Sequence, residues 1–369
     1  MEEVKITIIG AGVIGLAIAR ELSQVFDNIL VLERNKTFGQ ETSSRSSEVV
    51  HSGIYYPKDS LKARLCVEGA SLLYEYCEQN FIPYSKLGKL IVASDEKETE
   101  YLKELYIRGM NNGVSGLRLL DKADINKIEP NVNAVSAIFS PNTGIFDSHS
   151  FMKRLYYSAK DSGVLFSFNS DVNLVEKKNS GYIIGLKNED YRFFSPIVIN
   201  SAGLYADKIA EMAGINIDRC NYRLQYSKGS YFSYSKQSPV KVLIYPVPHQ
   251  DLKGLGVHAT LDLGGRLRFG PDAELVDRID YTVDISKRDF FFESANRIIK
   301  NLDREAFTPD TAGIRPQLKG GGIKDFMIRN ESDKGLGGFI NLIGIESPGL
   351  TASLAIAKKV REIILSSLR

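Results

Sequence analysis

Cysteine is scarce in this sequence of 369 residues. The chain has only Cys66, Cys77 and Cys220, and no two of them form a C-x-x-C pair. This spacing argues against the common zinc-binding and thiol-redox motifs, so we expect no metal centre. Unpaired cysteines are typical of a reducing compartment, and the sequence therefore predicts free thiols and a cytoplasmic protein.

Charge of one sign and long apolar runs are also lacking. The formal net charge is +2, and no Lys/Arg-rich run suggests a nucleic-acid partner. No apolar run is long enough to cross a bilayer. Apolar residues make up 43% and charged residues 25% of the chain, which is typical of a globular protein. Because 369 residues exceed what one core usually supports, we expect two structural units.

What the sequence does contain is a glycine-rich turn near its start. The β-branched run from Val4 to Ile9 predicts a buried strand, and the turn Gly10–Gly15 follows at once. Apolar residues at helical spacing then run from Val13 to Leu22. A second apolar run, Ile29–Leu32, ends in Glu33. The order strand, glycine turn, helix, strand and acid is typical of a dinucleotide site.

Each part of this pattern has a physical reason. Gly10 permits a tight turn, Gly12 lets the backbone approach a pyrophosphate, and Gly15 lets the helix pack closely on the sheet. The helix start offers free N–H groups to the phosphates. Glu33 stands where an acid accepts ribose hydroxyls, which disfavours NADP but does not separate FAD from NAD. The residues expected at the pyrophosphate and ribose are Gly10, Gly12, Val13, Ile14, Gly15 and Glu33.

Several further blocks of the sequence form a recognisable pattern. They are residues 51–56 (HSGIYY), 61–66 (LKARLC), 200–207 (NSAGLYAD), 244–248 (IYPVP), 255–258 (LGVH), 313–316 (GIRP) and 341–353 (NLIGIESPGLTAS). Through these blocks the sequence resembles the D-amino-acid-oxidase-like family of FAD-dependent oxidoreductases and, within it, the L-2-hydroxyglutarate dehydrogenase/oxidase branch. At Arg45-Ser46 and Glu48 the chain departs from the His-Asn and Gly usual in that branch.

The resemblance implies a fold and a division of the chain. We expect an α/β, doubly wound, Rossmann-like FAD-binding domain with a mostly parallel sheet, and an α+β substrate domain with an antiparallel sheet. The FAD-binding domain is expected at residues 1–80, 144–215 and 308–369, and the substrate domain at 81–143 and 216–307. The residue pattern itself predicts strands within 164–176, 192–200, 224–234 and 266–270, and a C-terminal helix over 352–368.

The resemblance also implies FAD as the cofactor and assigns more residues to it. Small hydroxyl side chains after Glu33 suit phosphate or flavin contacts, although a hydrogen-bonded turn explains the same residues. A proline–glycine turn before the C-terminal helix predicts a helix N-terminus facing the flavin, or alternatively an ordinary capped helix. The additional expected FAD-binding residues are Arg34, Thr42, Ser43, Ser44, Arg45, Ser47, Val172, Ala202, Gly203, Arg315, Glu346, Ser347, Pro348, Gly349, Leu350 and Thr351.

Oxidising a 2-hydroxy acid requires a base and a carboxylate clamp. Histidine suits the base because its pKa lies near neutrality, and the family position favours His51 and His258 without deciding between them. Arg315 is the expected clamp, since guanidinium binds carboxylate bidentately; a surface salt bridge is the alternative. Lys228, Tyr231 and Tyr245 are weaker candidates for substrate contacts. We expect His149 at a helix cap and His249 in a polar turn.

These features predict an FAD-dependent oxidoreductase that converts a 2-hydroxy acid, most simply L-2-hydroxyglutarate, to its 2-oxo acid. Electrons would pass to a quinone-type acceptor or to oxygen, with peripheral contact to the inner membrane face left open. The alternatives are an amine, amino-acid (glycine-type) or glycerol-3-phosphate oxidase of the same family, because of the departure at Arg45-Ser46. A flavin-binding protein without catalysis is a further alternative, disfavoured by His51 and Arg315.

Overall fold

The computed structural model describes residues 2–187, 191–248, 256–320 and 324–367. The chain forms two compact units, each built from separate stretches of sequence. Unit 1 comprises residues 1–44, 148–226 and 315–369, and unit 2 comprises residues 45–147 and 227–314. His249 and Leu255 lie outside the described residues, so the expectations for them have no structural counterpart here.

The bounds of the two units differ from those of the expected domains, most of all over residues 45–80. Residues 45–80 were grouped with the FAD-binding domain, whereas their contacts place them in unit 2. The physical reason is packing: Ile54 and Tyr55 belong to the apolar core of unit 2. The side chain of Asn112 also donates hydrogen bonds to the carbonyls of Gly53 and Tyr56, at 3.0 and 2.9 Å. The FAD-binding and substrate-binding labels of the two domains stay predictions.

Unit 1 is organised around a six-stranded sheet with the strand order β20-β21-β13-β1-β2-β9. The strands from β21 to β9 pair in parallel, and β20 is an antiparallel edge. Their side chains are mostly buried on both faces, which explains why the sequence shows continuous apolar runs. The bounds are β1 Ile6–Ile9, β2 Ile29–Leu32, β9 Leu165–Ser167, β13 Ile197–Asn200, β20 Met327–Glu331 and β21 Leu336–Ile343.

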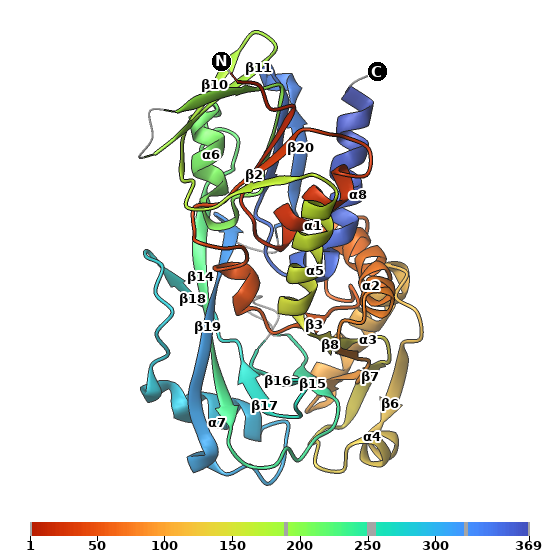
Figure 1. Cartoon of the computed structure of the whole chain (residues 1–369). Coiled ribbons are helices and arrows are strands. Elements are labelled where there is room, and N and C mark those ends of the chain that lie inside the picture. The colour runs from red at the N-terminus through yellow and green to blue at the C-terminus, as the bar shows by residue number, and fades with distance from the viewer. Residues whose placement is uncertain (1, 188–190, 249–255, 321–323, 368–369) are drawn as a thin grey trace. The chain divides into compact units, whose positions relative to one another are not determined.

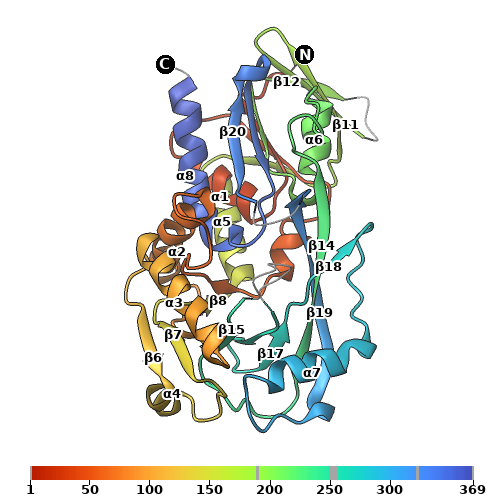
Figure 2. The ribbon, with the colours of Figure 1, turned by 180° about the vertical axis from the view of Figure 1, so that it is seen from behind.

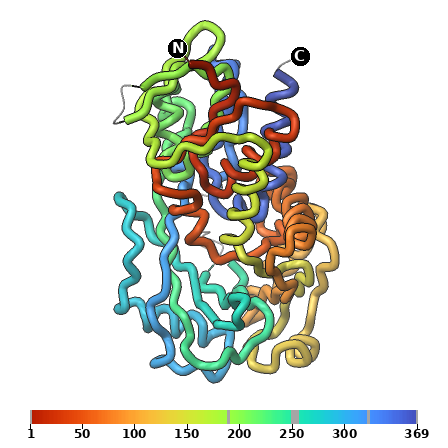
Figure 3. Tube along the Cα trace, viewed as in Figure 1, coloured from red at the N-terminus to blue at the C-terminus, as the bar shows by residue number. Residues whose placement is uncertain are grey.

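Helices cover both faces of this sheet, so the expected doubly wound fold is confirmed (Figures 1 and 2). Helix α1 packs against α5 and α8 on one face, whereas α6 contacts β13 and β21 on the other. Figure 3 shows that α1, near the start of the chain, and α8, at its end, lie side by side. The bounds are α1 Val13–Leu22, α5 Ser148–Asp161, α6 Ala206–Met212 and α8 Gly349–Ser367.

A smaller antiparallel sheet of unit 1 corrects one strand prediction. Residues 192–200 were expected to form a single strand, but β12 (Arg192–Ser195) and β13 join different sheets. Pro196 separates them, because proline has no N–H to continue a ladder. Strand β12 instead pairs with β11 (Gly181–Leu186), which pairs with β10 (Val172–Lys178).

Unit 2 contains a large, mostly antiparallel sheet. Its strand order is β18-β14-β17-β16-β15-β5-β7-β6, with β19 paired to β14, and β15 pairs with β5 in parallel. A small sheet, β3-β8-β4, accompanies it. The strands are β3 Val49–Val50, β4 Tyr84–Ser85, β5 Lys89–Ala93, β6 Arg118–Asp121, β7 Ser136–Ser140, β8 Gly144–Phe146, β14 Leu224–Tyr234, β15 Leu243–Pro246, β16 His258–Leu261, β17 Leu267–Gly270, β18 Glu274–Val276 and β19 Phe307–Leu318.

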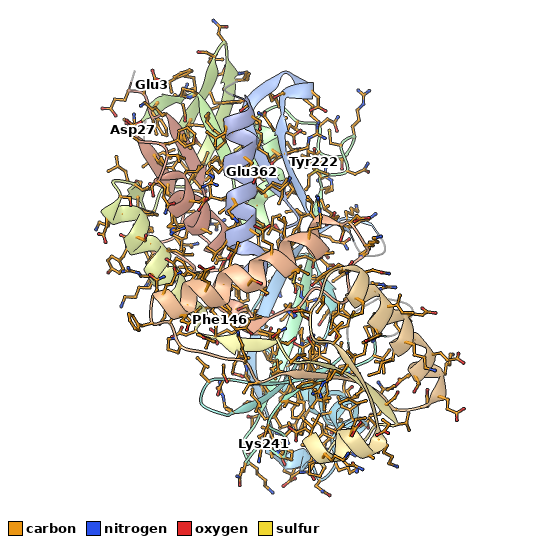
Figure 4. All side chains as sticks on the ribbon, turned by 90° about the vertical axis from the view of Figure 1, so that its right-hand side faces the viewer. Glu3, Asp27, Phe146, Tyr222, Lys241 and Glu362 are labelled. Atoms are coloured by element: carbon orange, nitrogen blue, oxygen red, sulfur yellow. The ribbon has the colours of Figure 1, made fainter. Side chains whose placement is uncertain are left out.

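Four helices complete unit 2: α2 Leu61–Gln79, α3 Glu96–Asn111, α4 Lys122–Ile128 and α7 Arg288–Asn296. Side-chain oxygens of Ser60, Asp95 and Asp121 cap the first three, as expected where polar residues precede a helix. In unit 1, α8 is amphipathic: Val360 and Ile364 are buried, and Glu362 marks its exposed side (Figure 4). Among the described helices, none has the length and apolarity needed to cross a membrane.

Candidate active site

The glycine turn of unit 1 joins β1 to α1 as the sequence predicts. Gly10 has a φ of +101°, in the left-handed region that favours glycine, and a Cβ there would lie 2.6 Å from the carbonyl oxygen of Ser201. A Cβ at Gly15 would overlap the carbonyl oxygen of Gly10. Both positions therefore exclude larger residues, because backbone atoms already fill the space that a side chain would need.

Gly12 has a different role, since it keeps a cradle open. It stands just before α1 and has no side chain of its own to cap the helix, and a Cβ would come within 3.1 Å of the Ser43 hydroxyl. That hydroxyl accepts a hydrogen bond of 3.0 Å from the Val13 N–H. A helix N-terminus of this kind attracts phosphate through its N–H groups and dipole. These residues fit the pyrophosphate of a dinucleotide.

Glu33 faces the same turn from the end of β2. Its Oε2 accepts the N–H of Ala11 at 2.8 Å, and its Oε1 accepts the backbone and side-chain N–H groups of Asn35 at 2.8 and 3.0 Å. The carboxylate is thus fixed beside the glycine turn. A carboxylate has about four acceptor positions, so capacity for ribose hydroxyls remains.

The other expected FAD-binding residues of unit 1 lie on three further segments. Ser43 and Ser44 form a 3-10 turn (η1, Thr42–Arg45), in which the Ser44 hydroxyl donates to the carbonyl of Glu41 at 3.1 Å. Ala202 and Gly203 follow β13, and the Ala202 Cα lies 3.1 Å from the position of a Cβ on Gly10. Val172 begins β10, and the guanidinium of Arg34 lies 4.1 Å above the Tyr205 ring.

The final block ends in the helix N-terminus that the sequence predicts. Helix α8 starts at Gly349, three residues before the expected start, and its first turn includes Leu350 and Thr351. The Glu346 carboxylate, in the turn that precedes it, accepts a hydrogen bond of 3.0 Å from the Gln317 amide. Pro348 contributes its carbonyl to the first turn by accepting the Ala352 N–H at 2.9 Å. This geometry is compatible with both the flavin-facing and the ordinary capped reading.

Arg315 belongs to β19 and is partly buried. Within the part of the chain that the structure describes, its guanidinium forms no ion pair with a carboxylate. This differs from the ion pair that Arg268 makes with Asp310, at 2.8 Å. The expectation that Arg315 binds a carboxylate therefore stays a prediction.

In unit 2, His51 directly follows β3, at the start of the block of residues 51–56. Its carbonyl accepts a hydrogen bond of 3.4 Å from the Cys66 thiol of α2. Ser52 next to it accepts from the Ser140 hydroxyl at 3.2 Å. Burial raises the pKa of the Cys66 thiol to about 12, so this cysteine acts as a hydrogen-bond donor and not as a nucleophile. Helix α2 thus contacts the His51 backbone, and β7 contacts the side chain of the adjacent Ser52.

His258 is buried on β16 and stacks on Tyr245 of β15. The ring centroids are 3.6 Å apart and the planes meet at 14°. Because Ile244 pairs with Ala259 in an antiparallel ladder, Tyr245 lies directly opposite His258. Burial, followed by the neighbouring Tyr231, holds the pKa of Tyr245 far above its ordinary value, so its hydroxyl stays neutral. The stack fixes the plane of the His258 imidazole.

Lys89 lies on the next strand, β5, and completes what we call the Lys89–Tyr245–His258 row. Its ammonium lies 4.7 Å from the Tyr245 ring centroid and 4.9 Å from that of Tyr55, and only 1% of the residue is exposed. Burial lowers the pKa of Lys89 to about 7. Lys89 is not among the residues predicted from the sequence. Its signal is a lysine that begins the apolar run of residues 90–93, a position from which lysine usually reaches solvent.

The weaker substrate candidates have defined partners. The Lys228 ammonium donates to the Thr282 carbonyl at 2.6 Å and to the Asp280 carboxylate at 3.4 Å. Hydrogen bonds from Thr282, with Lys228 nearby, lower the pKa of Asp280 to about 2. Tyr231 is buried on β14, with the Arg268 guanidinium 5.2 Å from its ring. Lys228 therefore already has ligands within the protein, whereas Tyr231 joins the surroundings of Tyr245.

Arg45 and Glu48, where the chain departs from the family, are unusual in structure as well. The Arg45 guanidinium stacks 3.8 Å above the Tyr281 ring, and the Arg45 Nε is buried without a hydrogen-bond partner among the described residues. Glu48 has a φ of +58°, a conformation that suits the glycine usual in the family. Ser47 lies between them and is partly buried. His149 lies in the first turn of α5 and is exposed.

The expected free cysteines and the expected lack of a metal site can be compared with the structure. Cys66, Cys77 and Cys220 are all free. Over residues 2–187, 191–248, 256–320 and 324–367, no cluster of His, Cys, Asp and Glu side chains could hold a metal ion.

The parallel sheet, its open glycine turn and the acid at the end of β2 are typical of a dinucleotide-binding fold. The chain belongs to the family of FAD-dependent oxidoreductases, whose family model matches residues 5–363. This confirms the predicted family and cofactor. The chain is an FAD-dependent oxidoreductase, and the assignment of Gly12, Ser43 and Glu33 to that cofactor stays a prediction.

Relatives cover the chain almost completely. It is 39% identical to an L-2-hydroxyglutarate dehydrogenase from Arabidopsis thaliana, over 97% of this chain and 83% of the relative. A glycerol 3-phosphate dehydrogenase from Caloramator mitchellensis is 34% identical, over 97% of this chain and 73% of the relative. Among solved structures, an FAD-bound L-α-glycerophosphate oxidase from Mycoplasma pneumoniae has a TM-score of 0.87 and 28% identity, covering 99% of this chain and 95% of the other.

Proposed function

We propose that this protein oxidises a 2-hydroxy acid, with L-2-hydroxyglutarate as its substrate and 2-oxoglutarate as its product. The observation that carries the proposal is likeness over the whole chain: relatives named L-2-hydroxyglutarate dehydrogenase are 39% and 36% identical over 97% of it. The oxidation removes two electrons and two protons from the alcohol carbon and its hydroxyl. FAD supplies the electron acceptor for the hydride when it is bound.

The protein side of this chemistry needs a base and a clamp. We assign the base to His51 or His258, because each imidazole can take the hydroxyl proton near neutral pH. We assign the substrate carboxylate to Arg315, whose guanidinium forms no ion pair with a described carboxylate. Tyr245 and Tyr231 are proposed to line the substrate side of His258, and Lys228 to act through the Asp280 segment.

The experiment that tests this proposal is anaerobic flavin bleaching. We expect L-2-hydroxyglutarate to remove the absorbance of the oxidised flavin, which for flavins in general lies at roughly 450 nm. The D-enantiomer and L-lactate serve as matched controls for the handedness and for the distal carboxylate. Unchanged absorbance with L-2-hydroxyglutarate, together with bleaching by glycine or glycerol 3-phosphate, would overturn the proposal.

A glycerol-3-phosphate dehydrogenase or oxidase is the second candidate. It is favoured by the Caloramator relative and by the similarity to the Mycoplasma oxidase, and by Arg45, a cation that could bind a phosphate. The two candidates separate in the same assay, because one substrate carries two carboxylates and the other a phosphate. An amine or amino-acid oxidase is tested by the glycine arm.

We also propose an electron acceptor and a cellular compartment for the protein. We propose a quinone-type acceptor or oxygen, and the cytoplasm as the compartment, on the ground of the three free cysteines. Peripheral contact with the inner membrane face would accompany a quinone acceptor. Stopped-flow reoxidation of the reduced enzyme with oxygen and with a soluble quinone compares the two acceptors, and sedimentation with liposomes tests the contact.

A further inference from the structure

Lys89 is a buried cation that has no buried anion beside it among the residues that the structure describes. The residue is 1% exposed in the core of unit 2, and no described carboxylate forms an ion pair with it. Burying an ammonium is costly unless a partner compensates it. Its neighbours are two aromatic rings, Tyr55 and Tyr245, and the thiol of Cys66. A cation–π contact returns only about 2 kcal/mol when desolvated, so the burial is not explained by stability.

The strand register explains how Lys89 reaches Tyr245. In the parallel ladder of β5 and β15, Lys89 pairs with Leu243 and Ile91 pairs with Tyr245. Side chains two residues apart share a face of a sheet, so Lys89 is the diagonal neighbour of Tyr245. His258 is the directly opposite neighbour on the other side. The three side chains thus lie side by side on three adjacent strands.

Tyr245 is therefore enclosed between an imidazole and an ammonium. The imidazole covers one face of the ring at 3.6 Å, which leaves no room for the ammonium on that face. The ammonium lies over the same ring at 4.7 Å and must occupy the other face. A displacement of Lys89 would consequently change the surroundings of the Tyr245 ring, on which His258 stacks.

We propose that Lys89 is a positioning residue for His258: its ammonium holds Tyr245 from behind and disfavours protonation of the stacked imidazole. The neutral imidazole is the form that can accept a proton from a substrate hydroxyl. The meaning of this coupling for catalysis rests on the proposed function, whereas the coupling itself does not require a particular substrate.

The other titratable groups around the Lys89–Tyr245–His258 row do not supply an uncompensated charge in place of Lys89. Arg268 of β17 approaches Tyr231, but Asp310 compensates its charge at 2.8 Å. On the Lys89 side, α2 contributes Cys66, whose thiol is neutral, and β7 contributes the uncharged Ser140 opposite Lys89. From α3, Arg108 donates to the Tyr55 carbonyl, and Tyr101 lies near Tyr55. The burial that lowers the pKa of Lys89 to about 7 makes its charge variable near neutral pH.

The test is a titration of His258 by nuclear magnetic resonance in the holoenzyme without substrate. The protein has four histidines, so selective ¹³C labelling gives four imidazole signals that single His→Gln variants assign. Lys89→Met removes the charge permanently and Lys89→Arg keeps it permanently. We expect the His258 midpoint to lie about half to one pH unit higher in the Met variant than in the Arg variant.

Lys86→Met is the matched control, because Lys86 also makes a cation–π contact, with Tyr74 at 4.6 Å, but is exposed. It should leave the His258 midpoint unchanged. The effect of Lys89→Met should shrink in a Tyr245→Leu background, which removes the ring between the two groups. Equal His258 midpoints in the Met and Arg variants, or an equal shift with Lys86→Met, would overturn the inference.

The titration also separates this inference from the proposed function. If L-2-hydroxyglutarate fails to bleach the flavin while Lys89→Met moves the His258 midpoint, the proposed substrate is wrong and the coupling stands. If bleaching occurs and the midpoint does not move, the coupling is wrong and the substrate stands. Where both hold, the rate of flavin reduction should show its acidic limb displaced in the Met variant in the same direction as the midpoint.

Discussion

The glycine turn of unit 1 and the Lys89–Tyr245–His258 row of unit 2 are encoded in opposite ways. The turn is encoded locally: Gly10, Gly12 and Glu33 lie within 24 consecutive residues, and the Val13 N–H beside them donates to the Ser43 hydroxyl. The row joins residues that are up to 169 positions apart, and only strand register brings them together. A short sequence motif indicates the chemistry of a local site, but it does not indicate the register in which distant strands pair.

The first prediction concerns the glycine turn of unit 1. Gly12→Val should weaken FAD binding by roughly 100-fold or more, because the loss of two charge-assisted hydrogen bonds at about 1.5 kcal/mol each has that effect. The side chain would fill the cradle that opens toward Ser43. Fluorescence titration of the apoprotein with FAD measures the change.

Gly337→Ala is the control for this variant. Gly337 is exposed on β21, and the nearest atom to a Cβ there is the Ser332 hydroxyl, at 3.8 Å. It should retain full FAD binding. Wild-type affinity in Gly12→Val would show that the turn does not hold the pyrophosphate.

The second prediction concerns the two histidines of unit 2. His51→Gln or His258→Gln should lower the rate of flavin reduction by about 100- to 10,000-fold for the histidine that acts as the base. The other should lose less, because it orients substrate without moving the proton. Rapid-mixing absorbance with L-2-hydroxyglutarate measures the rates, with the exposed His149→Gln as the control. Near wild-type rates in both variants would exclude histidine as the base.

These two sites show how far the sequence could be read. Helix α1 and strands β2 and β14 begin and end where the apolar pattern places them, because each has a strong periodicity with clear ends. The 192–200 strand was wrong because the weight of Pro196 as a ladder breaker was not recognised. Lys89 was missed for a deeper reason: no local rule says that a lysine at the edge of an apolar run turns inward.

The third prediction concerns how the stability of the protein depends on pH through Lys89. A lysine with a lowered pKa binds fewer protons in the folded state than in the unfolded state between about pH 7 and 10.5. The penalty for burying Lys89 is therefore complete below pH 7 and fades as the pH rises toward 10.5. Each pH unit of displacement corresponds to about 1.4 kcal/mol, so the full penalty is about 3 to 5 kcal/mol.

Lys89→Met should accordingly raise the melting temperature more at pH 6 than at pH 9. Differential scanning calorimetry at both values measures the effect, and Lys86→Met should show no such pH dependence because Lys86 is exposed. A gain of the same size at both pH values would mean that the ammonium carries no burial penalty. That result would contradict the account of Lys89 as an uncompensated cation.

The fourth prediction has the smallest expected effect and concerns the backbone at Glu48. Glu48 precedes β3 with a φ of +58°, where a residue with a Cβ is strained by about 1 kcal/mol. Glu48→Gly should relieve this strain, whereas Glu48→Ala removes the same carboxylate and keeps the Cβ. The Gly variant should therefore be more stable than the Ala variant by about 1 kcal/mol in urea unfolding followed by circular dichroism.

The comparison between the two variants matters more than either against the wild type, since both lose whatever the Glu48 side chain contacts. A larger stability for Ala than for Gly would show that the local backbone adapts to a side chain without cost. The expected order would instead mean that the chain tolerates strain at Glu48, three residues before His51. In that case the glutamate at this position is kept for a reason other than stability, and the effect of Glu48→Gly on the KM for L-2-hydroxyglutarate is the measurement that would reveal it.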